Sequence, residues 1–542
     1  MSASTKKKLR SAEREEMLTQ KQLKEQKEAK KLKLITTIFV VAIALMLCFA
    51  IVITAVKTVE NSGIRERNTV ALTLNDHEIS NAELNYYYID SINNFYSYYG
   101  SYAYLMGLDS TLPLDQQIID ETTGKTWADD FINSAVDNAK AVYALNDAAA
   151  AAGFVMSDSE KNDLEASIAT MELYATYSYG YPDFETYLKT VYGHGASVES
   201  YREYCTMNYL ADAYQNSYLT SLTYEDADLR EAEADNYDAY TSYTYNYYYL
   251  NAQNLVEKDD SGNYTDEQYA EAVELAETYA KKLTDGINTV EALDAAIATL
   301  PMNAEVENAA STASKDVLNG SVFSTFKDWV TSNERQIGDV TYVPNTTTST
   351  DDAGNETTKI NGYYVVLFGG RNENNIPMAN VRHILAAFEG GTTDELGNTV
   401  YSEEEKITAQ NAATLIYETW KSGDATEESF AELANKESDD GDGTTGGLYE
   451  NINPSTSFVT NFKNWALADH NPGDTEIIET EYGYHVMYYS GQSEMTYRDF
   501  MITEDLKGEA LNNWYTELVN AVNAQIQDTK YMTKDLVLSS GQ

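Results

Sequence analysis

The chain has 542 residues, enough for about three or four domains, and its formal net charge at pH 7 is −49. A surface this acidic repels phosphate, so nucleic acid is excluded as an expected partner. Only two cysteines are present, and the first, Cys48, lies in an apolar run near the N-terminus. The rest of the chain holds Cys205 alone and cannot form an internal disulfide.

The first 56 residues predict a basic tail followed by a membrane anchor. Residues 1–33 carry eleven Lys and Arg against five Asp and Glu, and residues 34–56 carry no charge. A helix of this length, rising about 1.5 Å per residue, is long enough for a hydrocarbon core of about 30 Å. Because the basic residues precede the span, the positive-inside rule places the N-terminus in the cytoplasm and the chain beyond residue 57 outside the cell membrane.

Two other interpretations of this segment are weaker. The run Ile53-Thr54-Ala55 is compatible with signal-peptide cleavage, but the long basic lead and the length of the apolar run favour an uncleaved anchor. Lipidation of Cys48 is disfavoured, because Leu47 stands where a small residue is wanted.

Residues 57–225 predict a short β-hairpin followed by helices. Two β-prone runs flank a turn at Asn75-Asp76, and Ser80 with Glu83 then shows the pattern of a capping box that starts a helix. The expected strands are 70–74 and 77–79, and further helices are expected at about 127–152, 157–177, 183–192 and 197–222.

Residues 226–371 predict a strand, helices and a closing hairpin. A β-prone run is followed by a capping box at 265–268 and an amphipathic helix, then by an aromatic segment at 326–329. A Thr-, Asn- and Asp-rich insert from 344 to 358 is expected to interrupt the final hairpin, which closes with Gly-Tyr-Tyr-Val-Val at 362–366.

Residues 377–491 follow the same plan with a histidine at each end. A strand-like run at the start carries His383, and a second at the end carries His485; an amphipathic helix opening with a Ser402-to-Glu405 capping box, a second helix and a turn-rich loop lie between them. A fold that lays the two runs side by side would bring both imidazoles into one cleft. The alternative is two unrelated histidines packed in strands.

The two regions match piece by piece. Phe-Lys-Asp-Trp from Phe326 corresponds to Phe-Lys-Asn-Trp from Phe462, and both regions close on Gly-Tyr-X-Val. The alignment puts tyrosine where the later region has histidine: Tyr248 for His383 and Tyr364 for His485.

Residues 377–491 resemble the parvulin peptidyl-prolyl cis/trans isomerases, especially the extracytoplasmic foldases of the PrsA and SurA type. The matching pieces occur in order: His-Ile-Leu from His383, Phe-Ala-Glu-Leu-Ala from Phe430 with a following Ser-Asp, Gly-Gly-Leu ending at Leu448, two aromatic residues four apart, and Tyr-Gly-Tyr-His ending at His485. The resemblance implies an enzyme that isomerises Xaa-Pro bonds without a cofactor.

The resemblance also implies which residues form the site. Asp440 stands where the family has Cys or Asp, whereas Phe458 stands where the family usually has Met. The implied catalytic residues are His383, Asp440, Thr480, Tyr482 and His485, and the implied proline pocket consists of Leu448, Phe458 and Phe462.

The rest of the chain fits the same type. Residues 57–225 resemble its helical chaperone domain, and residues 226–371 look like a second parvulin domain that has lost both histidines and so binds or spaces instead of catalysing. In the last part, 492–542, a helix from about 497 to 528 is expected to pack back on the chaperone domain. The expected fold class is an α+β multidomain chain with a single transmembrane helix at 34–56.

The expected function is that of a membrane-anchored foldase that acts on unfolded, proline-containing exported polypeptides, and a homodimer is compatible with it. The alternative is a holdase or surface peptide-binding protein with a catalytically silent parvulin fold. The loop from Ser438 resembles a calcium loop, but serine at the first ligand position and Tyr449 at the twelfth match calcium poorly, so no metal is expected.

Overall fold

The computed structural model describes most of the chain beyond residue 60. The described residues are 61–259, 261–350, 354–394, 397–441 and 443–538, together with 4, 6–8, 10, 11, 43, 45, 46 and 57–59. The predicted span at 34–56 lies outside them, apart from three isolated positions. Within the described ranges, none of the helices combines the length and the apolar character that a membrane crossing requires.

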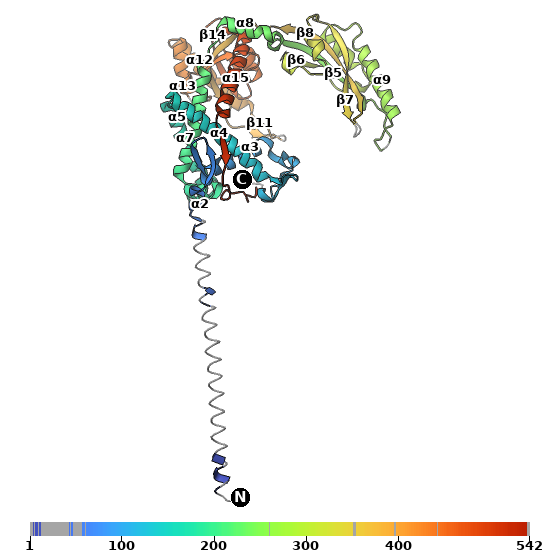
Figure 1. Ribbon diagram of the computed structural model, residues 1–542. Coiled ribbons are helices and arrows are strands. Elements are labelled where there is room, and N and C mark those ends of the chain that lie inside the picture. Colours follow the sequence, from blue (N-terminus) through green and yellow to red (C-terminus); the bar gives the residue numbers. More distant parts are fainter. Residues whose placement is uncertain are drawn as a thin grey trace. The chain divides into compact units, whose positions relative to one another are not determined.

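The chain divides into two compact units, residues 1–222 with 510–542 and residues 223–509. The first unit is mainly helical and begins with the expected hairpin (Figure 1). Its elements are α2 (Ile64–Asn68), β1 (Val70–Leu74), β2 (His77–Ser80), α3 (Asn81–Tyr99), β3 (Ile118–Asp120), β4 (Lys125–Thr126), α4 (Trp127–Ala152), α5 (Asp158–Leu173), α6 (Phe184–Tyr192), α7 (Val198–Ser221) and β15 (Ala524–Ile526).

The helix predictions in this unit are confirmed to within a few residues, but the cap of α3 differs from the expected box. The Ser80 hydroxyl accepts the Glu83 amide hydrogen, as predicted. The Glu83 carboxylate accepts a hydrogen bond from the hydroxyl of Tyr143 on α4 at 2.5 Å. Glu83 therefore joins two helices, a contact that local sequence cannot reveal.

The C-terminal segment returns to the first unit, as expected, but partly as a strand. β15 pairs antiparallel with β1, and Ile526 lies opposite Leu72. Trp514, on the helix α15 (Tyr497–Asn520) that precedes it, stacks on Tyr218 of α7 with ring centroids 4.1 Å apart. The predicted helix end at 528 is wrong, because residues 524–526 form sheet hydrogen bonds with β1 instead.

The second unit contains two four-stranded antiparallel sheets with equivalent strand orders, β6-β5-β8-β7 and β12-β9-β14-β13. After α8 (Asp226–Asp235), the first sheet and its helices comprise β5 (Ser242–Asn251), α9 (Asp266–Lys282), α10 (Val290–Ala298), β6 (Thr312–Leu318), α11 (Lys327–Thr331), β7 (Val340–Thr350) and β8 (Glu356–Asn372). The second sheet and its helices comprise β9 (Pro377–Ala387), β10 (Thr392–Thr393), β11 (Thr399–Val400), α12 (Glu403–Ser422), α13 (Glu427–Glu437), β12 (Leu448–Ile452), α14 (Thr460–Ala466), β13 (Thr475–Glu479) and β14 (Gly483–Thr496).

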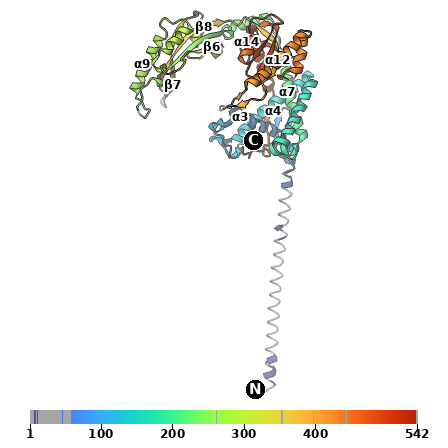
Figure 2. The ribbon, with the colours of Figure 1, turned by 180° about the vertical axis from the view of Figure 1, so that it is seen from behind.

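Each sheet buries one face under its two longer helices and the other under a short helix. On the first sheet, α9 and α10 pack over Val365 and Leu367. The view from behind shows α9 lying alongside this sheet (Figure 2). On the second, α12 and α13 cover Ile384 and Val486, and α14 packs on the opposite face. Because successive strand residues point to opposite faces, the position of a side chain along a strand decides which layer it enters.

The insert at 344–358 does not interrupt the last hairpin of the first sheet. β7 continues to Thr350 and β8 begins at Glu356, and these two residues lie opposite each other. The insert therefore lengthens two paired strands, which suits its β-branched threonines.

Candidate active site

The two histidines predicted to share a cleft lie side by side on the second sheet. In the pairing of β9 with β14, His383 is opposite Met487 and His485 is opposite Leu385, so both histidines point to the α14 face. Their Nδ1 atoms are 3.1 Å apart, and their exposed fractions are 3% and 5%. The alternative of two unrelated packed histidines is therefore wrong.

A chain of polar contacts continues from both rings. His383 Nε2 lies 3.2 Å from an Asp440 carboxylate oxygen, and the hydroxyl of Tyr449 donates to the same oxygen at 3.2 Å. At the other end, His485 Nε2 lies 2.9 Å from Thr480 Oγ1. Four side chains thus form one line across the sheet, from a half-exposed carboxylate to a buried hydroxyl.

Burial and charge set the protonation of this line. Burial, with His383 close by, lowers the pKa of His485 to about 4, so this imidazole is neutral at physiological pH. The hydrogen bond from His383 holds the pKa of Asp440 at about 2, so this carboxylate is ionised. Burial raises the pKa of Tyr449, which keeps its hydroxyl protonated and able to donate.

These protonation states order the hydrogens. An ionised Asp440 only accepts, so His383 Nε2 carries a hydrogen. His383 Nδ1 and His485 Nδ1 lie within hydrogen-bonding distance of each other, and so do His485 Nε2 and the hydroxyl of Thr480. The site is a preorganised polar network with one carboxylate at its open end, and none of its groups is arranged as a nucleophile with its base.

The Ser-Asp loop places Asp440 by bonding to the edge of β9. Ser438 Oγ accepts the amide hydrogen of Leu385 at 3.1 Å, and Asp439 Oδ2 accepts that of Ala387 at 2.9 Å. The Gly-Gly turn fixes the other side of the loop, because a Cβ on Gly447, where φ is +66°, would lie 2.2 Å from the His383 carbonyl oxygen. Two of the motifs recognised in the sequence are thus contacts that hold the carboxylate beside His383.

Above the histidines is an apolar cavity of about 130 Å³. Phe462, 3% exposed, contacts both imidazoles edge-on, and Phe458 packs against Phe462 with ring centroids 5.0 Å apart. The residues that line the cavity are His383, Asp440, Tyr449, Ser457, Phe458, Val459, Phe462, Tyr482 and His485. Tyr449, Ser457 and Val459 were missed by the sequence interpretation, although all three adjoin residues that it singled out.

One predicted residue, Leu448, occupies another position than expected. Leu448 does not line the cavity; its neighbour Tyr449 does, because adjacent residues of β12 point to opposite faces of the sheet. Thr480 lies behind the site, where it bonds to His485, whereas Tyr482 is on the rim and 58% exposed. The structure thus brings together seven of the eight residues that the resemblance implies, with Leu448 outside.

The sheet register corrects the alignment of the earlier region. His383 lies opposite Met487, and the equivalent pair on the first sheet is Tyr247 opposite Val366. Tyr248 points to the other face, where its hydroxyl contacts Asn303. Tyr247, and not Tyr248, therefore takes the place of His383.

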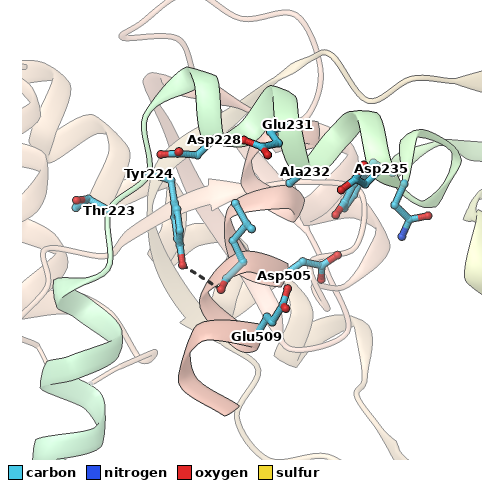
Figure 3. A pocket seen from close by; sticks show the side chains of 11 residues that line it. Thr223, Tyr224, Asp228, Glu231, Ala232, Asp235, Asp505 and Glu509 are labelled. Carbon is cyan, nitrogen blue, oxygen red and sulfur yellow. Dashed lines mark hydrogen bonds between the residues drawn. The ribbon is translucent and has the colours of Figure 1, made fainter. Parts of the chain in front are cut away.

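A larger cavity of about 710 Å³ lies between α8 and the middle of α15, where the hydroxyl of Tyr224 donates to the carbonyl of Leu506 (Figure 3). Five carboxylates line it, and no histidine, cysteine or cationic residue is among the lining residues: Asp228, Glu231, Asp235, Asp505 and Glu509 supply the charges. Within the described ranges no group of three or more His, Cys, Asp or Glu could hold a metal ion.

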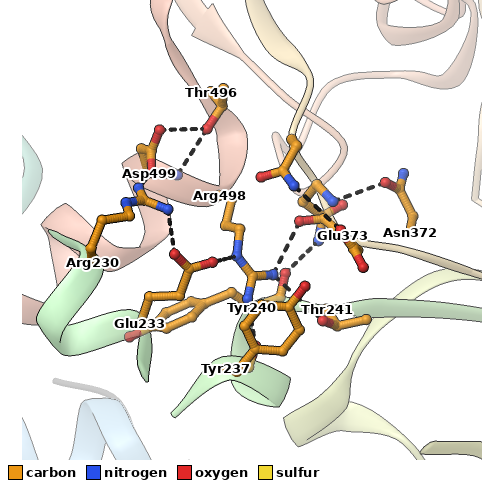
Figure 4. A network of polar contacts seen from close by, with 12 residues as sticks. Arg230, Glu233, Tyr237, Tyr240, Thr241, Asn372, Glu373, Thr496, Arg498 and Asp499 are labelled. Atoms are coloured by element: carbon orange, nitrogen blue, oxygen red, sulfur yellow. Dashed lines mark hydrogen bonds and ion pairs between the residues drawn. The ribbon is translucent and has the colours of Figure 1, made fainter. Parts of the chain in front are cut away.

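The polar network beside it has a structural role. Arg498 is fully buried and pairs with Glu233 of α8 (Figure 4). Its guanidinium also donates to the carbonyls of Tyr237 at 2.7 Å and Glu373 at 3.1 Å, so it joins α8 and α15 to the link between the two sheets. Breaking a buried ion pair of this kind costs about 3–5 kcal/mol.

The comparisons with known proteins agree with this geometry. Residues 383–491 match the Rotamase family, described as the PPIC-type PPIASE domain. These residues therefore form a domain of the parvulin-type peptidyl-prolyl cis/trans isomerase class, which is an enzyme domain.

Three solved PrsA structures are similar to this chain. PrsA from Bacillus subtilis aligns at 11% identity over 78% of this chain and 98% of its own, with a TM-score of 0.30. The peptidylprolyl isomerase PrsA of Bacillus cereus aligns at 16% over 52% and 96%, with a TM-score of 0.19. That of Bacillus anthracis aligns at 16% over 28% and 59%, with a TM-score of 0.16, so this chain spans little more than half of its length. No curated protein matches the chain.

Proposed function

We propose that this protein is a membrane-anchored foldase that acts outside the cytoplasm and isomerises Xaa-Pro bonds in unfolded exported polypeptides. The observation that carries the proposal is the cavity over His383 and His485, where two phenylalanines form an apolar wall above a floor of imidazoles. A proline ring is apolar and small, and it suits such a wall better than any charged or extended side chain does.

Rotation of the bond needs no covalent step. The barrier is about 18–20 kcal/mol because amide resonance must be lost, and uncatalysed Xaa-Pro rotation takes tens to hundreds of seconds. The twisted amide is less polar than the planar one, so a site that holds the ring and excludes water favours it. Phe458 and Phe462 would hold the ring, and the network through His383, His485 and Asp440 would keep the polar floor fixed during the rotation.

The other parts of the chain would bring clients to this site. Residues 34–56 would anchor the protein in the cell membrane with its N-terminus in the cytoplasm, and residues 57–225 would act as a chaperone domain. The first sheet, within 226–371, would be a degenerate parvulin-like domain, because tyrosines replace both histidines while the strand order is kept. A homodimer is an assembly that this proposal allows.

A second candidate function is that of a holdase that binds peptides without turning them. The observation that favours it is on the first sheet, where Phe323 is 47% exposed and packs beside Tyr247 and Tyr364. Exposed aromatic side chains grip apolar segments of unfolded chains.

The deciding experiment measures cis/trans exchange of a short Xaa-Pro peptide by NMR with the full chain, with a chain lacking residues 377–491 and with a chain lacking 241–370. We expect exchange to be catalysed by the full chain and by the third form but not by the second. Equal exchange with and without residues 377–491 would leave the holdase function. Protease added outside intact cells should digest the chain beyond residue 57, and a protected ectodomain would contradict the proposed topology.

A further inference from the structure

A second cavity adjoins the proline pocket. It measures about 460 Å³, and the segment Thr480–Tyr482 separates it from the pocket: Thr480 and Glu481 line the second cavity, whereas Tyr482 lines the pocket. The amide of Phe388, which also lines the second cavity, donates to the carbonyl of Tyr482 at 2.9 Å. The two cavities thus share one wall.

This shared wall places the second cavity within reach of the same peptide. An extended chain advances about 3.3 Å per residue, and successive side chains project in opposite directions. A proline ring held in the pocket over His485 would place a flanking residue beside Tyr482, next to the segment that lines the second cavity. The cavity is therefore positioned to select that residue.

The floor of the second cavity is aromatic. Phe388 is 8% exposed, and its ring centroid lies 5.0 Å from that of Tyr401, which also lines the cavity. Lys406 completes the wall, with Nζ 5.8 Å from the centre of the Phe388 ring. Such a floor accepts the aliphatic stem of a long side chain.

The charges at this cavity sum to a negative value. Lys406 Nζ lies 3.2 Å from one Glu479 oxygen, and the hydroxyl of Tyr484 donates to the other oxygen at 3.0 Å. That pair is neutral as a whole. The exposed carboxylate of Glu481 on the rim then leaves an excess of one negative charge.

The nearest cation on β9 does not offset this charge. Arg382 Nε pairs with Glu427 at 2.9 Å, and its Nη1 donates to the carbonyls of Thr445 and Gly446. Its guanidinium is thus held in the Gly-Gly loop and is not directed at the peptide. An acidic or phosphorylated flanking residue would meet repulsion from Glu481, whereas a cationic one would meet attraction.

We propose that the second cavity is a specificity subsite for a lysine or arginine next to the isomerised proline, with Glu481 as the residue that selects it. The proposal rests on the isomerase function of the neighbouring pocket. The alkyl stem would lie on Phe388 and Tyr401, and the cationic head would pair with Glu481 at the rim. Because Glu481 is exposed and the pair is screened by water, its effect is a preference of about three- to fivefold.

The test uses the full chain and peptides in which lysine, norleucine or glutamate stands directly before or after proline. NMR exchange gives kcat/KM for each peptide without a coupling protease. We expect one of the two positions to favour lysine over norleucine by about three- to fivefold and to disfavour glutamate, with both differences shrinking at high salt. Norleucine separates charge from stem length, because it has nearly the same alkyl chain.

Glu481→Gln should remove the preference, and Glu481→Lys should transfer it to the glutamate peptide. Glu432→Gln, an exposed substitution on α13 that lines neither cavity, should leave it unchanged. Turnover of all peptides at one rate in the parent would overturn the subsite while leaving the isomerase intact. No turnover even of the norleucine peptide would overturn the proposed function itself.

Discussion

The two sheets of the second unit share a scaffold and differ in the side chains on one face. This face is covered by α14 in the second sheet and by α11 in the first. Both keep the strand order, and both need glycine at one matched position: a Cβ on Gly362 or Gly483 would lie 2.1 or 2.2 Å from the carbonyl oxygen of the facing strand. On the second sheet this face carries an imidazole pair linked to a carboxylate. On the first, Tyr247 and Tyr364 pack against each other with ring centroids 6.0 Å apart.

This difference separates the contacts that stabilise the fold from those that organise the candidate active site. Phe326 contacts Tyr247 and Tyr364 as Phe462 contacts the two histidines, so the buried aromatic residue serves the scaffold in both sheets. The Ser-Asp and Gly-Gly loops, which bond to β9 of the second sheet, position Asp440. The polar line is therefore the part that sets the second sheet apart.

The most direct test of this comparison substitutes the phenylalanine that the two sheets share. Phe462→Ala and Phe326→Ala each empty a buried site, and each should destabilise its sheet by about 3–5 kcal/mol in urea unfolding. Only Phe462→Ala should also slow peptide exchange, by more than about tenfold, because it removes about 1.4 kcal/mol or more of contact with the twisted proline. Equal exchange in the two folded variants would mean that the cavity over the histidines does not hold the ring.

The same two sheets show which features of the site could be predicted from the sequence. The histidine pair, the Ser-Asp loop and the matched aromatic segments were predictable, because each combines a rare residue type with a fixed order. The register of the first sheet was not. In the run Tyr247-Tyr248-Tyr249 every residue can face either side, so the hydrophobic pattern does not decide which tyrosine stands at the place of His383.

Other errors have the same origin in contacts between distant residues. Whether Leu448 or Tyr449 enters the pocket depends on the pairing of β12 with β9, and the strand at 524–526 depends on the free edge of β1. Local periodicity carries neither fact. The subsite beside the pocket was also beyond the sequence, since Phe388, Lys406 and Glu481 come from three separate segments.

The pH dependence should separate the two sheets. His485 has a pKa of about 4 in the folded state against an ordinary value of 6.5, so the unfolded chain takes up a proton first as the pH falls. The stability of the second sheet is therefore full above about pH 6.5 and decreases by about 2–3 kcal/mol between there and pH 4. The first sheet has no histidine in residues 241–370, so its stability should not decrease through protonation of a histidine.

Unfolding followed by fluorescence reports the two sheets separately in two variants, one with Trp465 and one with Trp329 as the only tryptophan of the chain. Parallel pH profiles at both reporters would contradict the assignment of a buried, neutral His485. Peptide exchange should fall as His485 becomes charged near pH 4.

Substitution of the imidazoles should have a smaller effect on stability than loss of Phe462. His383→Ala or His485→Ala leaves a polar partner, Asp440 or Thr480, without its contact, which costs about 1–3 kcal/mol together with slower exchange. The matched changes Tyr247→Phe and Tyr364→Phe should leave exchange unaltered. If folded histidine variants exchange at the parent rate, the polar line is only structural, as on the first sheet.

The smallest effect is expected at the open end of the line. Asp440 is 41% exposed and partly screened by water, so Asp440→Asn should slow exchange by about fivefold and not abolish it. The reason is positional: an ionised carboxylate requires hydrogen on His383 Nε2, and an amide, which can donate as well as accept, removes that requirement. Nitrogen NMR should accordingly show a hydrogen on His383 Nε2 in the parent and only partial occupancy of that nitrogen by hydrogen in Asp440→Asn, whereas Asp424→Asn, on an exposed turn, should change neither this occupancy nor the rate. Unchanged occupancy with a slower rate would assign Asp440 a direct electrostatic effect on the twisting amide. Loss of nearly all exchange would make the carboxylate a reaction partner and contradict rotation in a shaped pocket.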